Sequence, residues 1–444
     1  MFAAHYVRWL SLLLSALVLA TSMPARAQLV GGLPGAGPIQ STLPPVRRRL
    51  PPAVREVVSE TVPEAVTDAA GDVASRVRTP EIERLLRRHR DVLDTDHAGA
   101  PVVRNQVVAI DPTDAALARA LGAGFRIGDA RTLDPLGLRI VVLHGPEGVG
   151  TRSALARLRT LDPSGSYDFN HLYFGSGGAA SGSGQAPDAP STATASARVG
   201  LIDSGVARDH PALAGVDVRS WGCDGTPVPA AHGSAVASLL VGANDGPAPS
   251  GTTLFAADIY CGRPTGGAVT GYAEAMAWLA RHGVGVINLS LVGPPNALLQ
   301  RATAALVSRG HVLVAAVGND GPAAPPLFPA AYPGVIGVTG VDPRKRALPE
   351  AVRGTQVDFA APGSNLRAAR LDGGWDTVRG TSFAAPLVAR AAAAQVREPG
   401  DGRAARVRAQ LAERALDLGD QGRDDTYGLG WLAPAASIAS AGPD

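Results

Sequence analysis

Residues 380–386 read Gly-Thr-Ser-Phe-Ala-Ala-Pro and run directly into an apolar, alanine-rich stretch at 387–396. Glycine at 380 permits a sharp reversal of the backbone, and Ser382 falls where a helix would begin. The free N–H groups of a helix N-terminus would face whatever lies in front of that serine. Pro386 is expected in about the first turn of the helix, where a missing N–H costs least. The stretch could hold a nucleophile, although a lone Gly-Thr-Ser is more often a helix cap.

Upstream of this stretch, apolar runs alternate with amphipathic segments. The pattern predicts strands at 199–202, 254–260, 284–289, 312–316 and 335–338, and helices at 234–241, 272–281 and 297–308. Continuous apolar strands separated by helices are typical of a parallel sheet that is covered on both faces. We therefore expect an α/β fold with a doubly wound, mainly parallel sheet, whose functional groups gather at the carboxyl ends of the strands.

Three polar residues follow strands or begin helices of this predicted sheet. Asp203 ends the first strand in an Asp-Ser-Gly turn, His232 opens a His-Gly-Ser helix start, and Asn319 lies in a Gly-Asn turn after a buried strand. Each alone is more often an ordinary turn or cap. Together with Ser382 they give the order Asp, His, Asn, Ser along one sheet.

This order and wording resemble the subtilisin-like serine proteases, the subtilases. Their motifs are an Asp-Ser/Thr-Gly turn, a His-Gly-Ser/Thr helix start, a Gly-Asn turn and a Gly-Thr-Ser-x-Ala-x-Pro serine turn. The resemblance covers about 199–432, including a closing Tyr-Gly-Leu-Gly-Trp at 427–431. It implies that Ser382 is the nucleophile, His232 the general base, and Asp203 the carboxylate that orients the imidazole.

The resemblance also implies how substrate would be held. The side chain of Asn319 and the backbone N–H of Ser382 would donate to the oxyanion of the tetrahedral intermediate. Residues 288–293 resemble the edge segment that takes up an extended peptide as an added strand, and a glycine pair at 266–267 would flank the peptide's other side. The substrate-binding residues predicted in this way are Gly267, Ser290, Leu291, Val292, Gly293 and Ala316.

Several positions depart from the family pattern. Val292 stands where glycine is usual and Val317 where alanine is usual, so a narrowed primary pocket is expected. The bond between Phe328 and Pro329 falls where the family has a cis-proline, and we expect it to be cis. The loop 242–251 is short and has few oxygen ligands, so no calcium site, no other metal and no cofactor are predicted, while weak calcium sites elsewhere are left open.

The chain before the peptidase-like region divides into four parts. Residues 1–27 combine a short apolar run with Ala-Arg-Ala and predict a cleaved signal peptide, with an uncleaved anchor as the alternative. Residues 28–100 form an extension rich in Pro and Arg, within which 53–95 has helical spacing and no assigned role. A β-α-β-β-α pattern over 101–174, with a last strand near 167–173, predicts a small ferredoxin-like α+β domain.

That small domain also resembles the family's propeptide, although its pattern is far less specific than the catalytic motifs. Residues 175–198 are almost wholly Gly, Ser, Ala, Pro and Thr and predict a flexible linker before the peptidase domain, 199–444. If the propeptide interpretation holds, a self-cleavage site lies in this linker or just before it. The enzyme would then be made as a precursor that binds its own propeptide.

Composition limits the partners. The sequence has 41 Lys and Arg against 39 Asp and Glu, a net charge of +2, which gives no general argument for nucleic acid. No segment after residue 27 is expected to insert stably in a membrane, so we expect an exported, periplasmic or extracellular protein that acts on proteins or peptides. Cys223 and Cys261 could form one disulfide or remain two buried thiols. Two other functions stay open: a peptide-binding module without catalysis, and a protease that acts only on itself or on one partner.

Overall fold

The computed structural model describes residues 78–179, 198–242 and 251–433. The predicted signal peptide, the extension before residue 78 and most of the predicted linker lie outside these ranges. A search of the described helices finds none that is both long enough and apolar enough to span a bilayer.

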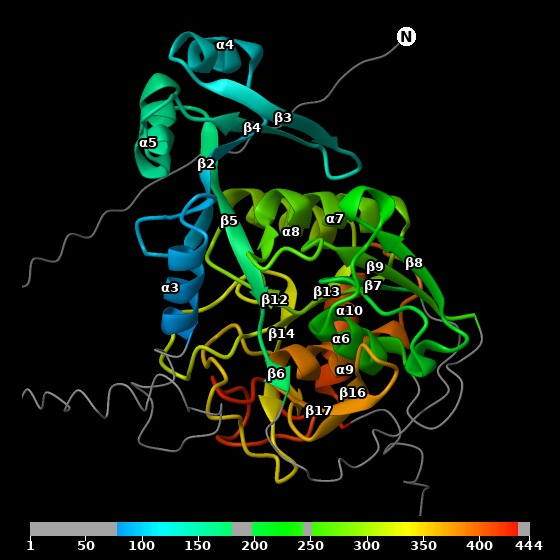
Figure 1. Cartoon of the computed structure of the whole chain (residues 1–444). Helices are drawn as coiled ribbons and strands as arrows, with labels where there is room; N and C mark the ends of the chain where they lie inside the picture. Colours follow the sequence, from blue (N-terminus) through cyan, green and yellow to red (C-terminus); the bar gives the residue numbers. More distant parts are fainter. Residues whose placement is uncertain (1–77, 180–197, 243–250, 434–444) are drawn as a thin grey trace, which may run out of the picture. The chain divides into compact units, whose positions relative to one another are not determined.

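Seven strands form the central sheet in the order β15-β14-β13-β11-β7-β9-β8, and every neighbouring pair is parallel (Figure 1). The strands are β7 (Arg198–Asp203), β8 (Asp217–Trp221), β9 (Thr253–Asp258), β11 (Val286–Leu289), β13 (Val312–Ala316), β14 (Val335–Val341) and β15 (Phe359–Pro362). The order changes direction beside β7, because β9 lies on one side of it and β11 on the other. The predicted doubly wound α/β sheet is therefore confirmed.

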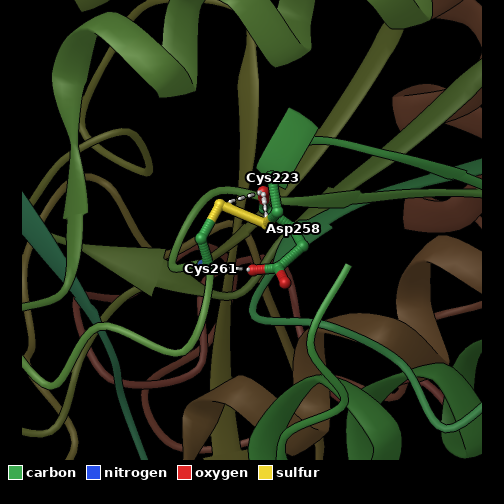
Figure 2. Close-up of side chains that lie close together, drawn as sticks. All are labelled: Cys223, Asp258 and Cys261. Atoms are coloured by element: carbon green, nitrogen blue, oxygen red, sulfur yellow. Dashed lines mark hydrogen bonds between the residues drawn. A yellow bond between two sulfur atoms is a disulfide. The ribbon is translucent and has the colours of Figure 1, made fainter. Parts of the chain in front are cut away.

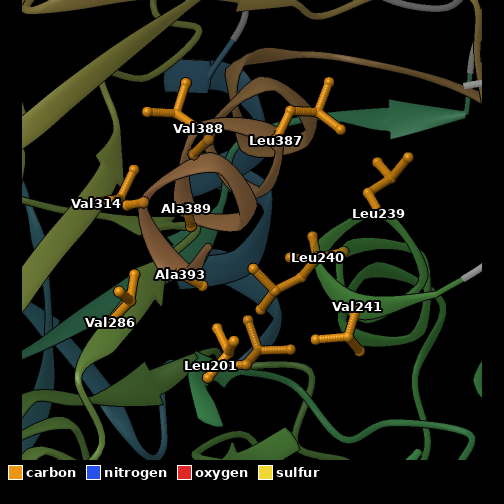
Figure 3. Close-up of a cluster of buried hydrophobic side chains, with 14 of the residues drawn as sticks. Leu201, Leu239, Leu240, Val241, Val286, Val314, Leu387, Val388, Ala389 and Ala393 are labelled. Atoms are coloured by element: carbon orange, nitrogen blue, oxygen red, sulfur yellow. The ribbon is translucent and has the colours of Figure 1, made fainter. Parts of the chain in front are cut away.

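Helices cover both faces of this sheet (Figure 1). They are α6 (Ala231–Val241), α7 (Val269–Arg281), α8 (Ala297–Ser308), α9 (Thr381–Ala393) and α10 (Arg403–Ala412). Successive residues of a strand point to opposite faces of the sheet and so pack in different cores. Leu201 of β7 packs with α6 and α9, while Ile202 belongs to the cluster of α7 and α8. Figure 3 shows side chains of the first of these cores, among them Leu201 of β7, Leu240 of α6 and Val388 of α9. Burial on both faces explains why the inner strands of the sheet are predominantly apolar.

The predicted elements of this domain are present, with shifted ends. The strand predicted at 254–260 ends at Asp258, and the one predicted at 284–289 begins only at Val286. Strands β8 and β15 and helix α10 were not predicted: β8 and α10 carry charged side chains, and β15 has only four residues. The predicted cis bond between Phe328 and Pro329 is present.

A small α+β domain precedes the large sheet. Its elements are β2 (Pro101–Ile110), α4 (Asp114–Gly122), β3 (Arg126–Leu133), β4 (Leu138–His144), α5 (Thr151–Leu161) and β5 (Ser166–Gly175). The antiparallel order β5-β2-β4-β3 is that of a ferredoxin-like unit, with β1 (Leu93–Thr95) added beside β2. Helices α4 and α5 bury one face of this sheet. On the other face, Val108 and Ile140 join the buried cluster that contains α7 and α8.

The first residues of the linker predicted at 175–198 belong to strands in the structure. Strand β5 continues to Gly175, and β6 (Gly178–Ala179) pairs with β17 (Trp375–Arg379), which in turn pairs with β16 (Leu366–Ala369). The first residues of the predicted linker are thus held between strands. Upstream, α3 (Arg78–Arg88) accounts for part of the helical spacing predicted over 53–95, and residues 53–77 lie outside the described ranges.

Candidate active site

Asp203 and His232 meet at the carboxyl end of the sheet. Asp203 is the last residue of β7 and is fully buried, while His232 is the second residue of α6. The imidazole Nδ1 lies 2.8 and 3.0 Å from the two carboxylate oxygens. Because a carboxylate only accepts hydrogen bonds, Nδ1 carries the proton and Nε2 keeps its lone pair. Nε2 is buried and has no hydrogen-bond partner among the residues that the structure describes.

The turn after β7 fixes this pair in place. Both the backbone N–H and the hydroxyl of Ser204 donate to Asp203 Oδ1, at 2.7 and 3.0 Å. The same hydroxyl accepts from the N–H of Gly233, at the start of α6. A Cβ on Gly233 would stand 2.1 Å from the carbonyl oxygen of Ser204, so only glycine allows the helix to approach this closely. The sequence analysis quoted both motifs but did not assign this bridging role to Ser204.

Ser382 is the second residue of α9, directly after a reversal at Gly380, whose φ is 137°. Pro386 lies in the second turn of the helix rather than the first, so the carbonyl oxygen of Ser382 loses its helical partner. The hydroxyl of Ser290 donates to that oxygen at 2.9 Å, and Asn288 Nδ2 donates to the same hydroxyl. Proline therefore opens the helix to a side-chain contact that anchors the serine turn to the neighbouring strand end.

The structure does not join Ser382 to His232. The Ser382 hydroxyl donates to the carbonyl oxygen of Ser290 at 3.0 Å and accepts from the N–H of Ser176 at 2.9 Å. The two hydroxyls of Ser176 and Ser382 lie 2.7 Å apart. The His232 ring packs beside Phe383, the next residue along α9, with centroids 5.4 Å apart. The chain's own Ser176 thus occupies the space in front of Ser382, and the preceding residue, Gly175, lies beside the His232 ring.

Two N–H donors face this segment. The backbone N–H of Ser382 donates to the carbonyl oxygen of Ser176 at 3.1 Å. The Thr381 N–H donates to Asn319 Oδ1, which leaves the amide nitrogen of Asn319 directed at the cleft. That nitrogen and the Ser176 oxygen lie 2.8 and 3.0 Å from where a Cβ on Gly380 would stand, so a side chain there would fill the space between them. This arrangement suits the stabilisation of negative charge on a carbonyl oxygen.

Strand β5 runs through the cleft between two predicted substrate-binding edges. It pairs antiparallel with β10 (Gly267–Ala268), where Gly267 is opposite Tyr173. It also pairs with β12 (Leu291–Val292), where Leu291 is opposite Gly175. This is the strand addition that the sequence analysis expected of a substrate, carried out by the chain's own residues.

The remaining predicted substrate-binding residues have different positions. A Cβ on Gly293 would stand 2.6 Å from the Tyr173 ring, so glycine makes room for that side chain. Ser290 contacts Ser382 through both its hydroxyl and its carbonyl. Ala316 is fully buried in the core of α6 and α9.

Tyr173 fills a deep apolar pocket. Its side chain is fully buried, its ring lies edge-on to Tyr272 with centroids 5.4 Å apart, and its hydroxyl donates to the carbonyl oxygen of Pro294 at 2.8 Å. Burial raises the pKa of both phenols, and the charge of Asp203 raises the pKa of Tyr272 further. Both tyrosines therefore stay neutral at any working pH.

A small apolar cluster lies at the edge strand β12, which pairs with Phe174 and Gly175 of β5. Val292, Leu327 and Val352 form a separate buried cluster, with Ala324 packed against it. The sequence analysis singled out Val292 but missed Leu327, which precedes the cis-proline pair and showed no periodic or motif signal.

A disulfide joins Cys223 to Cys261, with their Cα atoms 5.1 Å apart (Figure 2). The buried carboxylate of Asp258 lies beside it and accepts from the backbone N–H groups of Val228, Tyr260 and Cys261, each at 2.9 Å. Of the two alternatives left open, the disulfide is the one formed. Within the described residues, Cys223, Asp258 and Cys261 are the one group of three or more His, Cys, Asp or Glu side chains close enough to share a metal ion. The two sulfurs of this group form the disulfide.

The comparisons with known proteins agree with this geometry. The model of the subtilase family matches residues 195–430. Subtilisin DY of Bacillus licheniformis is 30% identical over 241 residues, covering 51% of this chain and 86% of that protein. Thermitase of Thermoactinomyces vulgaris is 34% identical over 215 residues, covering 46% of this chain and 77% of that protein.

Among solved structures, fervidolysin from Fervidobacterium pennivorans superimposes with a TM-score of 0.62 at 19% identity, covering 77% of this chain and 61% of that one. Fervidolysin is described as a keratinolytic enzyme related to subtilisin, and at this identity the likeness shows the fold alone. The fold and the relatives define a hydrolase, a serine-type endopeptidase. The chain belongs to the subtilase family.

Proposed function

We propose that this chain is an exported precursor of a serine endopeptidase that cleaves peptide bonds, its own first, with a triad of Ser382, His232 and Asp203. The observation that carries the proposal is the contact at the centre of the cleft. The N–H of Ser382 donates to the carbonyl oxygen of Ser176 while β5 is held between β10 and β12. A peptide bond is thereby presented to the candidate nucleophile in an extended conformation.

The proposed chemistry needs one rotation. When the Ser382 hydroxyl turns from Ser290 to the unpartnered Nε2 of His232, its proton passes to the imidazole as Oγ attacks the carbonyl carbon of Ser176. The oxyanion is held by the Ser382 N–H and the Asn319 amide. The imidazolium, stabilised by Asp203, then gives its proton to the leaving nitrogen, and water hydrolyses the ester that remains on Ser382.

We propose Ser176–Gly177 as the first bond cleaved. Strand pairing holds residues up to 175 on one side of Ser382, and β6 pairs with β17 on the other side, so the chain passes straight across the nucleophile. The leaving group would be the amine of Gly177. The small domain at 101–174 would act as a propeptide that fills the cleft until it dissociates.

The proposed preference is for a small residue before the cleaved bond. Val292, Leu327 and Val352 form a buried apolar cluster at the edge strand β12, which pairs with Phe174 and Gly175 directly before Ser176, so little space for a large side chain is expected there. The long apolar pocket that holds Tyr173 offers a second site of selection, three residues earlier. Export is proposed from the signal-like residues 1–27, and no calcium site is proposed.

Two other functions are weaker. A binding module without catalysis would not need the Asp203–His232 contact or a second oxyanion donor. A protease restricted to itself or to one partner would use the same site and differ only in the substrates that reach it.

Intact mass and N-terminal sequencing of the purified full-length protein beside its Ser382→Ala variant test the proposal. We expect the wild type to yield a new N-terminus at Gly177 and the variant to stay whole at that bond. Equal cleavage of both proteins at Gly177 would assign the cut to another protease. An uncut wild type whose Ser382 also fails to react with a fluorophosphonate would favour the binding module.

A further inference from the structure

We propose that Tyr260 selects glycine at the position before the residue whose bond is cleaved. The inference rests on the proposed function and concerns a residue that lies outside the triad and the oxyanion donors. In the chain's own cleft segment this position is Gly175, directly before Ser176.

The Tyr260 hydroxyl bridges two backbone groups of β5. It accepts from the N–H of Gly175 at 2.9 Å and donates to the carbonyl oxygen of Tyr173 at 3.1 Å. A phenol has one proton to donate and can accept, so both contacts are made by the same oxygen. We call this pair of hydrogen bonds the Tyr260 clamp. Since backbone groups are common to every peptide, the clamp would hold any extended substrate at the same position in the cleft.

The loop that carries Tyr260 is held firmly. The backbone N–H of Tyr260 donates to the buried Asp258 carboxylate, and the Tyr260 carbonyl accepts from the N–H of Arg263. The next residue, Cys261, is tied to Cys223 by the disulfide (Figure 2). The hydroxyl is therefore a fixed point against which the peptide strand is set.

When the Tyr260 clamp holds β5 in this position, Gly175 lies against the imidazole of His232. A Cβ added at Gly175 would stand 2.9 Å from Nε2 and 3.0 Å from each of Cδ2 and Cε1. The ring cannot retreat freely, because both carboxylate oxygens of Asp203 hold its Nδ1. On the strand's other edge, Gly175 is paired with Leu291. A side chain here must displace either the general base or the strand from its clamp, and glycine alone avoids both.

The test is a double-mutant cycle on self-cleavage in the full-length chain, with first-order rates from intact mass after refolding. An added methyl in a tight site is worth about 10-fold to 200-fold in rate, so we expect Gly175→Ala to slow cleavage by that factor. Tyr260→Phe keeps the ring but loses two hydrogen bonds, and we expect a slowing of about 5-fold to 150-fold. In the double variant the released strand can lift away from His232, so we expect cleavage no slower than with Gly175→Ala alone.

Multiplied effects in the double variant, or a Gly175→Ala variant that is cleaved at the wild-type rate, would overturn the inference. Tyr427→Phe is the matched control, because within the described residues its hydroxyl accepts from the Ala347 N–H alone, and it should not relieve Gly175→Ala. Melting temperatures of all variants in a Ser382→Ala background identify any that fail to fold. Failure of the wild type to cleave at all would instead count against the proposed function.

Discussion

Tyr173 should dominate the affinity of the small domain for the peptidase domain. Its side chain lies in the cluster of α7 and α8 rather than in the small domain's own core, and β5 pairs with β2 only as far as His171. Truncating a fully buried aromatic residue costs about 3 to 5 kcal/mol. Tyr173→Ala should therefore weaken the complex by about 100-fold to 4000-fold without unfolding the small domain.

Tyr173→Phe separates the ring from its hydrogen bond. It keeps the edge-on contact with Tyr272 and loses only the bond to the Pro294 carbonyl, so the expected weakening is about 2-fold to 12-fold. The assay is serial dilution of the self-cleaved complex, with release followed by hydrolysis of a fluorogenic peptide. A dissociation constant for Tyr173→Ala within twofold of the wild type would refute the assignment of this pocket.

Three further changes probe the fold and the site. Reducing the Cys223–Cys261 disulfide in the Ser382→Ala protein should lower the unfolding free energy by about 4 kcal/mol, the loop-entropy value for a sequence separation of 38; an unchanged denaturation midpoint would contradict this. Burial raises the pKa of Glu274, and Arg131 offsets only part of that. Because the folded-state pKa is raised, the contribution of Glu274 to stability is fully present below its unfolded-state pKa and is lost as pH rises through the folded-state pKa. Glu274→Gln should therefore raise the melting temperature more at pH 7 than at pH 4. Equal shifts at the two pH values would argue against this role. Ser204→Ala removes a donor to the triad carboxylate and should lower kcat about tenfold with KM unchanged, whereas a change confined to KM would exclude that role.

Much of the fold was predictable because the strands of the large sheet other than β8 are buried on both faces. The apolar runs that end at Asp203 and precede Asn319 were read correctly for that reason. The positions of Asp203 and His232 followed from the same logic, since strand ends and helix starts meet at one edge of a parallel sheet. Strand β8 was missed because it borders the sheet and carries exposed polar residues.

The occupied cleft could not have been predicted from composition. Residues 175–179 are Gly-Ser-Gly-Gly-Ala, a composition that predicts a linker, yet strand pairing and the contacts of Ser176 with Ser382 hold them in place. Tyr260 carried no signal either, because its role depends on a hydroxyl meeting a strand that is distant in the sequence. Leu327 likewise acts through its packing against Val292.

Mass-spectrometric mapping of fluorophosphonate labelling tests the central claim most directly, because it asks which residue is the activated nucleophile. The wild-type protein after self-cleavage should be labelled at Ser382. The matched comparison is a His232→Ala protein in which an added protease makes the cut before residue 177. This protein should be labelled at least about 100-fold more slowly. Labelling of Ser382 at the wild-type rate without His232, or labelling at another residue, would contradict the account.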